Sequence, residues 1–178
     1  MTYFTEDQLR GYARSTELKK EARAHTKTLP SLANVRIFLS HSHKDRELAE
    51  GVANLLASQG CEVYIDWKDT TMPKVTNRET AERIRLRIRQ DDFFVCLATK
   101  NAMDSKWVPW ELGIADDSQG FDNILIIPVK DPYGRFHGNE YVQVYRRLDT
   151  DLNVLKPEDQ YYFQGVKLAS FMRARANV

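Results

Sequence analysis

Short apolar runs alternate with longer amphipathic segments over most of the chain. Four runs have the length and β-branched content of buried strands, at residues 35–40, 61–66, 92–98 and 123–129. Segments with apolar residues at helical spacing follow the first three runs, over residues 46–59, 76–89 and 103–117. Continuously apolar strands that alternate with helices are typical of a parallel sheet covered on both faces. The pattern therefore predicts an α/β domain.

The two ends of the chain carry weaker patterns. Residues 5–25 are polar with sparse apolar positions, which predicts a helical extension followed by a linker. An alternating run at 141–145 predicts a fifth strand, and residues 157–176, which begin with proline, predict a closing helix. The expected organisation is an N-terminal helical extension and linker over 1–34, then one domain over 35–178 with a central parallel five-stranded sheet flanked by helices.

The segment 83–89 has two readings. Arginine alternates with isoleucine and leucine at period two, which is typical of a strand with a basic face. However, Thr76 and Glu79 have the spacing of a capping box, and Ala81, Ile84 and Ile88 fall on one helical face. These flanks favour a helix whose arginines form a solvated face.

Composition narrows the class of protein. The 178 residues are 42% hydrophobic and 29% charged, which predicts an ordinary folded domain. The net charge of +1 supplies no global field for nucleic acid or an anionic membrane, so a phosphate-bearing ligand must be held by local charges. The acidic N-terminus and the absence of a long apolar stretch predict a cytoplasmic protein without a membrane anchor. Cys61 and Cys96 are expected to be unpaired, buried thiols.

A cluster after the first strand suggests metal binding. His41, His43 and Asp45 have the HxHxD spacing of metallo-β-lactamase-type hydrolases. In that motif a further histidine follows the aspartate, but Arg46 stands here, and His137 is the only histidine downstream. A two-metal site would lack ligands, so no metal is expected. The alternative reading is a turn in which Ser42 and Asp45 cap the next helix.

Several nucleotide-binding and hydrolytic classes lack their motifs in this chain. The third strand ends without the aspartate that a phosphoryl-accepting receiver domain needs. None of the eight glycines belongs to a GxSxG elbow, a GxGxxG turn or a Walker loop. A dinucleotide that binds here is therefore not expected to act as a redox cofactor.

The segment 105–115 carries the most informative chemistry. Trp107 and Glu111 are four residues apart and share a helical face, while Trp110 and Ile114 share the neighbouring face. This spacing places an aromatic ring beside a carboxylate. An alternative is that both tryptophans belong to the core and that Glu111 is an exposed helix residue; the pattern alone leaves the two readings open.

Four segments together resemble a Toll/interleukin-1 receptor (TIR) domain. They are the strand and turn 37–45 (IFLSHSHKD), the second strand 63–67 (VYIDW), the variable loop that follows it, and 105–112 (SKWVPWEL). The likeness covers residue 35 to the end and is closest to bacterial TIR proteins, including the NAD-consuming components of Thoeris-type antiphage defence. The resemblance implies a flavodoxin-like fold.

The resemblance also implies roles for individual residues. Glu111 matches the family's catalytic glutamate, and Trp107 matches the tryptophan of its WxxxE motif. Phe38, Ser40 and Asp66 match positions that line the family's nucleotide cleft. The loop 68–75 corresponds to the segment through which TIR domains stack on one another, which implies homotypic assembly.

The implied activity is cleavage of NAD+ at the bond between nicotinamide and ribose, as an NAD+ nucleosidase or ADP-ribosyl cyclase. NAD+ is then a substrate, and no cofactor is expected. The product is an ADP-ribose-type signal, linear or cyclic, for a downstream effector in bacterial immunity. The alternative function is a non-catalytic TIR scaffold that signals by homotypic assembly.

Overall fold

The computed structural model describes residues 3–28, 35–71, 77–157 and 165–176. Its strands are β1 (Phe4–Thr5), β2 (Arg36–Ser40), β3 (Glu62–Tyr64), β4 (Phe93–Ala98), β5 (Ile124–Lys130), β6 (Arg146–Leu148), β7 (Asn153–Leu155) and β8 (Val166–Lys167). Its α-helices are α1 (Glu6–Arg14), α2 (Thr16–Thr28), α3 (Arg46–Ser58), α4 (Arg78–Gln90), α5 (Lys100–Met103), α6 (Trp107–Gln119) and α7 (Leu168–Ala176). Single 3₁₀ turns are η1 (His43–Asp45), η2 (Asp66–Lys68), η3 (Phe121–Asn123) and η4 (Glu140–Val144).

The strands form one sheet whose centre is parallel. Its order is β3-β2-β4-β5-β6, followed by β7 and β8, which are antiparallel to their neighbours. The first five strands have the flavodoxin-like order, which confirms the predicted fold class. The two-residue strand β1 pairs in parallel with the C-terminal end of β5, where Phe4 lies opposite Val129.

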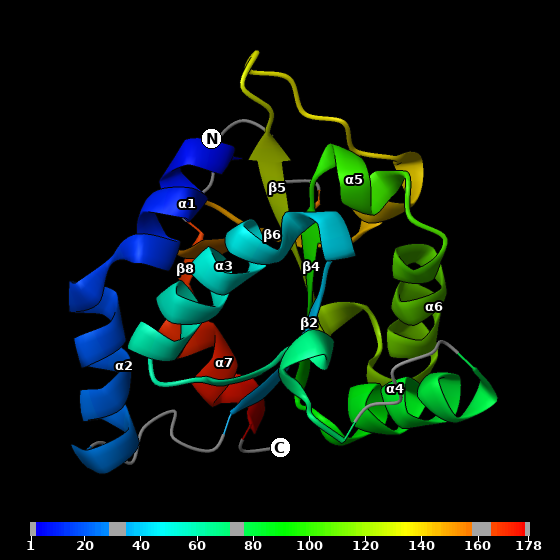
Figure 1. The fold of residues 1–178 in the computed structure, drawn as a ribbon, viewed down its shortest axis with the longest axis horizontal. Coiled ribbons are helices and arrows are strands. Elements are labelled where there is room, and N and C mark those ends of the chain that lie inside the picture. The colour runs from blue at the N-terminus through cyan, green and yellow to red at the C-terminus, as the bar shows by residue number, and fades with distance from the viewer. Residues whose placement is uncertain (1–2, 29–34, 72–76, 158–164, 177–178) are drawn as a thin grey trace.

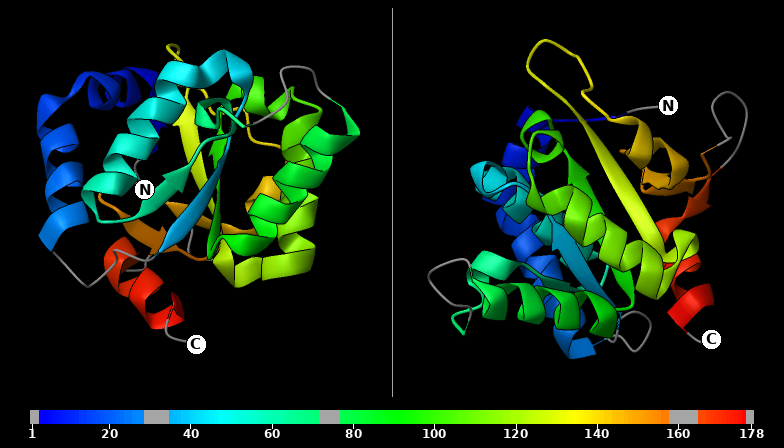
Figure 2. Two further views of the ribbon diagram at one scale, coloured as in Figure 1. Left: turned by 60° about the horizontal axis from the view of Figure 1, so that its bottom comes forward. Right: turned by 90° about the vertical axis from the view of Figure 1, so that its right-hand side faces the viewer.

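Helices cover both faces of the sheet, as Figure 1 and the two views in Figure 2 show. Alternate residues of β2 enter separate cores, because side chains along a strand point to opposite faces. Ile37 and Leu39 join the core under α1, α3 and α7, whereas Phe38 joins the core under α4, α5 and α6. Within the described ranges, no helix combines the length and the apolar character needed to cross a membrane.

The N-terminal segment packs into the first of these cores. Thr5 and Gln8 form a capping box that starts α1, in which Thr5 Oγ1 accepts from the Gln8 amide at 3.2 Å. The side chains of Phe4 and Leu9 are fully buried. Helices α1 and α2 agree with the predicted helical extension, and β1 is too short for a sequence pattern to predict. The boundary between 34 and 35 stays a prediction.

Glycine permits the close contact between α3 and α1. A Cβ on Gly51 would collide with the carbonyl oxygen of Leu9. We expect Gly51→Ala to lower the free energy of unfolding by about 1–3 kcal/mol through this overlap, although alanine has the higher helix propensity by roughly 1 kcal/mol. Gly11→Ala is the matched control, because apart from neighbouring backbone of its own helix no atom lies within 4 Å of its Cβ position, and it should stabilise the protein. Equal shifts in urea unfolding of the two variants would contradict this packing account.

Three predictions about local structure are wrong in detail. Asn77, not Thr76, caps α4, and its side chain accepts from the Thr80 amide at 3.0 Å. Residues 141–144 belong to η4 instead of a strand, and Val142 within it and Tyr145 directly after it are buried three residues apart, which is the 3₁₀ period. The fifth parallel strand is β6. The closing helix begins at Leu168 after the short strand β8, and residues 158–164 lie outside the described part.

Candidate active site

The candidate site lies at the carboxyl ends of β2 and β4. The connection after β2 leads to α3 on one face of the sheet, whereas the connection after β4 leads to α5 and α6 on the other face. Ligands of open α/β sheets bind at such a switch point. Ser40, the last residue of β2, and Glu111 of α6 meet here.

Helix α6 carries Glu111 into the protein. Ser105 Oγ accepts a hydrogen bond from the Trp107 amide at 3.1 Å, which fixes the start of the helix. Val108, Leu112 and Glu111 share the buried face of α6, and Glu111 is only 7% exposed. The alternative reading of Glu111 as an exposed helix residue is therefore wrong.

Glu111 contacts the end of β2 directly. Ser40 Oγ donates a hydrogen bond to Glu111 Oε2 at 2.6 Å, and Ser40 itself is 1% exposed. Burial raises the pKa of Glu111 to about 8; the hydrogen bond from Ser40 opposes this rise, and the charge of Asp66 adds to it. At neutral pH the carboxyl group therefore holds its proton unless a cation binds beside it.

Asp66 lies between two histidines at the end of β3. His41 Nε2 is 3.8 Å from Asp66 Oδ1, and His43 Nε2 is 3.8 Å from Asp66 Oδ2. His41 Nδ1 lies 3.0 Å from the carbonyl oxygen of Leu39, so this nitrogen carries the proton and Nε2 carries the lone pair. Burial lowers the pKa of His41, an effect that the charge of Asp66 partly offsets. The sequence pattern indicated His41 only as a metal ligand or as a turn residue. In the structure its side chain is 3% exposed and lies beside Asp66.

Asp45 acts differently from its expected role as a helix cap. Its side chain makes no capping hydrogen bond to α3. Its carboxylate instead accepts from Thr99 Oγ1 and, at 2.7 Å, from Asn101 Nδ2, which ties the loop after β2 to the start of α5. Ser42 does accept from the Lys44 amide, at 3.4 Å. Over the described ranges, no three His, Cys, Asp or Glu side chains gather as metal ligands would.

The two aromatic residues of the predicted site have different surroundings. Phe38 is 2% exposed and stacks between Tyr64 and Phe94, with ring centroids 5.6 and 5.7 Å away. Phe38 is therefore a packing residue beneath the site, and its direct contact with substrate stays a prediction. Trp107 is half-buried, and its ring meets that of Trp110 edge-on at 5.1 Å.

The predicted assembly loop is described only in its first part. Asp69 closes a turn by accepting from the amide and the hydroxyl group of Thr71, and it also accepts from Tyr64 Oη at 2.9 Å. The remaining positions, 72–75, lie outside the described residues. The free cysteines Cys61 and Cys96 are buried, as predicted, and burial raises the pKa of both thiols to about 12.

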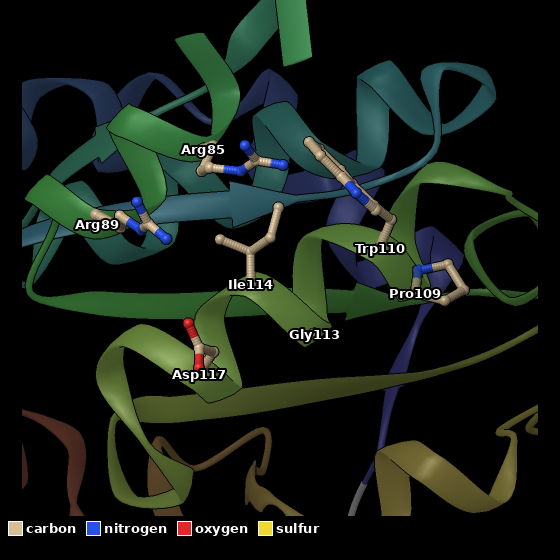
Figure 3. A pocket seen from close by; sticks show the side chains of 7 residues that line it. All are labelled: Arg85, Arg89, Pro109, Trp110, Gly113, Ile114 and Asp117. Carbon is tan, nitrogen blue, oxygen red and sulfur yellow. The ribbon is translucent and has the colours of Figure 1, made fainter. Parts of the chain in front are cut away.

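An open groove of about 430 Å³ lies on the outer side of α4 and α6 (Figure 3). Arg85 and Arg89 enter it from α4, and Trp110 and Ile114 enter it from α6. The guanidinium carbon of Arg85 is 5.8 Å from the centre of the Trp110 ring. None of the five predicted site residues lines this groove, so it is separate from the Ser40–Glu111 contact.

Comparisons with known proteins agree with this geometry. Residues 37–155 match the sequence profile of the TIR domain. Over 114 residues the chain is 35% identical to the "Probable 3' cyclic ADP-D-ribose synthase ThsB'" of Bacillus cereus (strain MSX-D12), a match that covers 61% of this chain and 58% of the relative. It is 26% identical over 110 residues to the "Putative cyclic ADP-D-ribose synthase TIR2" of Cytobacillus dafuensis, covering 53% of this chain and 29% of the relative. The chain thus spans well under two thirds of each relative, and the profile match shows that it belongs to the TIR-domain family.

Proposed function

We propose that this TIR domain cleaves NAD+ between nicotinamide and ribose and converts it to an ADP-ribose-type product. The observation that carries the proposal is the buried contact between Glu111 and Ser40 at the switch point of the sheet. A buried carboxyl group whose pKa is raised this far is typical of a functional site. The names of the two relatives, both cyclic ADP-D-ribose synthases, support the same reaction class.

A single carboxylate is sufficient for cleavage of the bond between nicotinamide and ribose. Nicotinamide is already a cation in NAD+, so it leaves with the bonding electron pair as a neutral molecule and needs no general acid. The ribose carbon then has oxocarbenium character, which a negative charge stabilises in a buried site of low polarity. The positive charge of bound nicotinamide also favours the ionised form of Glu111 over the neutral form. NAD+ is the substrate in this scheme, and no further cofactor takes part.

The product depends on which oxygen reaches the ribose carbon. Attack by water forms a bond to that carbon, releases a proton and gives ADP-ribose. Attack by a hydroxyl group of the other ribose releases a proton in the same way and gives a cyclic form of ADP-ribose, which contains one water less. Trp107 stacks on a substrate ring in this proposal and limits the access of water, which favours internal attack. A downstream effector would then bind the nucleotide product.

Incubation of the concentrated protein with NAD+ tests the proposal. We expect nicotinamide to appear together with ADP-ribose or with a cyclic form of ADP-ribose that is lighter by one water, as resolved by chromatography and mass spectrometry. An absence of nicotinamide at every protein concentration would contradict the proposal and would favour a scaffold that acts only by homotypic assembly.

Self-association through the loop 68–75 is a separate prediction. If a second copy completes the site, nicotinamide release should rise more steeply than in proportion to protein concentration. Thr70→Glu should suppress this rise, because Thr70 is exposed and a new charge would be buried against the partner copy. Gln90→Glu adds the same charge at an exposed end of α4 and is the control. Proportional activity down to monomeric concentrations, or equal effects of the two variants, would contradict assembly through this loop.

A further inference from the structure

The proposed substrate poses a problem of charge. The predicted site contains two acidic groups, Glu111 and Asp66, together with Ser40 and two aromatic side chains, and it contains no cation. NAD+ carries two phosphate groups, and proteins bind phosphates mainly through arginine, lysine and backbone amides. The overall charge of +1 cannot replace a local cation. A subsite for the phosphates must therefore come from residues outside the predicted set.

Two cations lie over one indole ring beside Asp66. Trp67 follows Asp66 in η2, and the guanidinium carbon of Arg46 lies 5.5 Å from the centre of its ring. Lys68 Nζ lies 5.1 Å from the same centre. Contact between a cation and the face of tryptophan is attractive and restricts the side chain, so less conformational entropy is lost when an anion binds.

These cations sit at the same edge of the sheet as Glu111. Arg46 is the first residue of α3 and follows η1 in the connection that leaves β2, and η2 begins two residues after the end of β3. The 3.8 Å approach of His43 Nε2 to Asp66 Oδ2 brings these two connections together. Because β2 also ends at Ser40, which contacts Glu111, the two cations and the carboxyl group belong to one rim.

Arg46 has no acidic partner in the described part of the chain, and it stands at the N-terminus of a helix. Among the residues that the structure describes, its guanidinium forms no ion pair, whereas Lys68 Nζ lies 3.6 Å from Glu50 Oε1. A cation in the first turn of a helix is disfavoured by the positive end of the helix dipole. A charge that breaks a local rule and has no acidic partner to compensate for it is a mark of a functional position. An anion that binds here would relieve the repulsion.

We propose that Arg46, assisted by Lys68, forms the subsite for the pyrophosphate of NAD+ and of its ADP-ribose-type product. The identity of this ligand rests on the proposed function. The guanidinium plane can donate two parallel hydrogen bonds to one phosphate group, which fixes the orientation of the dinucleotide as well as its position. This contact is remote from the bond that breaks. It is therefore equally strong in the ground state and the transition state, so it lowers KM and leaves kcat nearly unchanged.

Calorimetry with ADP-ribose tests the subsite without requiring catalysis. We expect Arg46→Gln to weaken ADP-ribose binding by about 10- to 100-fold, the typical worth of a charge-assisted contact. Arg46→Lys should recover part of the loss. Arg89→Gln is the matched control, because Arg89 is also exposed and forms no ion pair with a described residue, and it should change the affinity less than about twofold. Failure of ADP-ribose to bind the wild-type protein at millimolar concentration, or equal affinities of wild type and Arg46→Gln, would overturn the subsite.

Kinetics separate this proposal from the proposed function. With NAD+ as substrate, Arg46→Gln should raise KM by a similar factor while kcat stays within about threefold. If nicotinamide is released and KM does not change in Arg46→Gln, the subsite is wrong and the proposed function stands. If ADP-ribose binds through Arg46 but no nicotinamide is ever released, the subsite stands and the proposed function is wrong. A fall in kcat alone would show a structural role for Arg46 and would also overturn the subsite.

Discussion

Replacement of Glu111 by glutamine is expected to lower nicotinamide release by about 10²- to 10⁴-fold, the usual effect of removing one electrostatic or proton-handling group. Glutamine keeps the shape of the side chain, and its amide oxygen can still accept the hydrogen bond from Ser40. The substitution removes only the negative charge that would face the developing cation on ribose. Nicotinamide release at matched protein concentration measures the effect, and circular dichroism checks the fold.

Asp91→Asn provides a control for the loss of a buried carboxyl group. Asp91 is 4% exposed, and burial raises its pKa to about 6. It follows α4, just before the start of β4, whereas the candidate site lies beyond the other end of that strand. We expect Asp91→Asn to release nicotinamide at nearly the wild-type rate. A folded Glu111→Gln protein as active as wild type would show that Glu111 is not catalytic.

Much of the central fold could be predicted because its strands are buried on both faces. β2, β4 and β5 are continuous apolar runs, and such runs bounded by polar residues indicate central parallel strands. The edge of the sheet could not be predicted in the same way. β1 and β8 have two residues each, so they show no periodicity and form only because a neighbouring strand offers hydrogen-bonding partners.

Ser40 and Glu111, two of the predicted site residues, are in contact, but the burial of Glu111 could not be predicted from the sequence. The four-residue spacing of Trp107 and Glu111 places them on one face of α6, but spacing does not show which face packs on the sheet. Val108 and Leu112 decide this, because their burial turns Glu111 inward toward Ser40. The role that we propose for Arg46 could not be seen in the sequence either, since its contact with Trp67 joins segments about twenty residues apart.

The burial of Glu111 should also govern how stability depends on pH. The pKa of this group is 4.5 in the unfolded reference and about 8 in the folded protein. Between these values the folded state keeps the proton and the unfolded state loses it, so the folded state binds more protons. The free energy of unfolding must then fall as pH rises from 4.5 to 8, and it levels off above that range. A pKa difference of this size corresponds to a loss on the order of 5 kcal/mol over the whole range.

Glu111→Gln removes this titration, so the variant should gain stability relative to wild type as pH rises. Urea unfolding at pH 5 and pH 9 measures the change in the difference between the two proteins, expected to be on the order of 4 kcal/mol in favour of the variant. Comparing the two pH values cancels any constant cost of burying the amide. The comparison of variant with wild type at each pH cancels the opposite contribution of His41, which both proteins share and whose lowered pKa makes the fold more stable as that histidine loses its proton. A difference that does not change with pH would mean that Glu111 ionises in the folded protein as it does in water. A difference that grows with pH would mean that burial of this carboxyl group lowers the stability of the fold. A bound cationic substrate would offset this loss, because its positive charge favours the ionised form of Glu111.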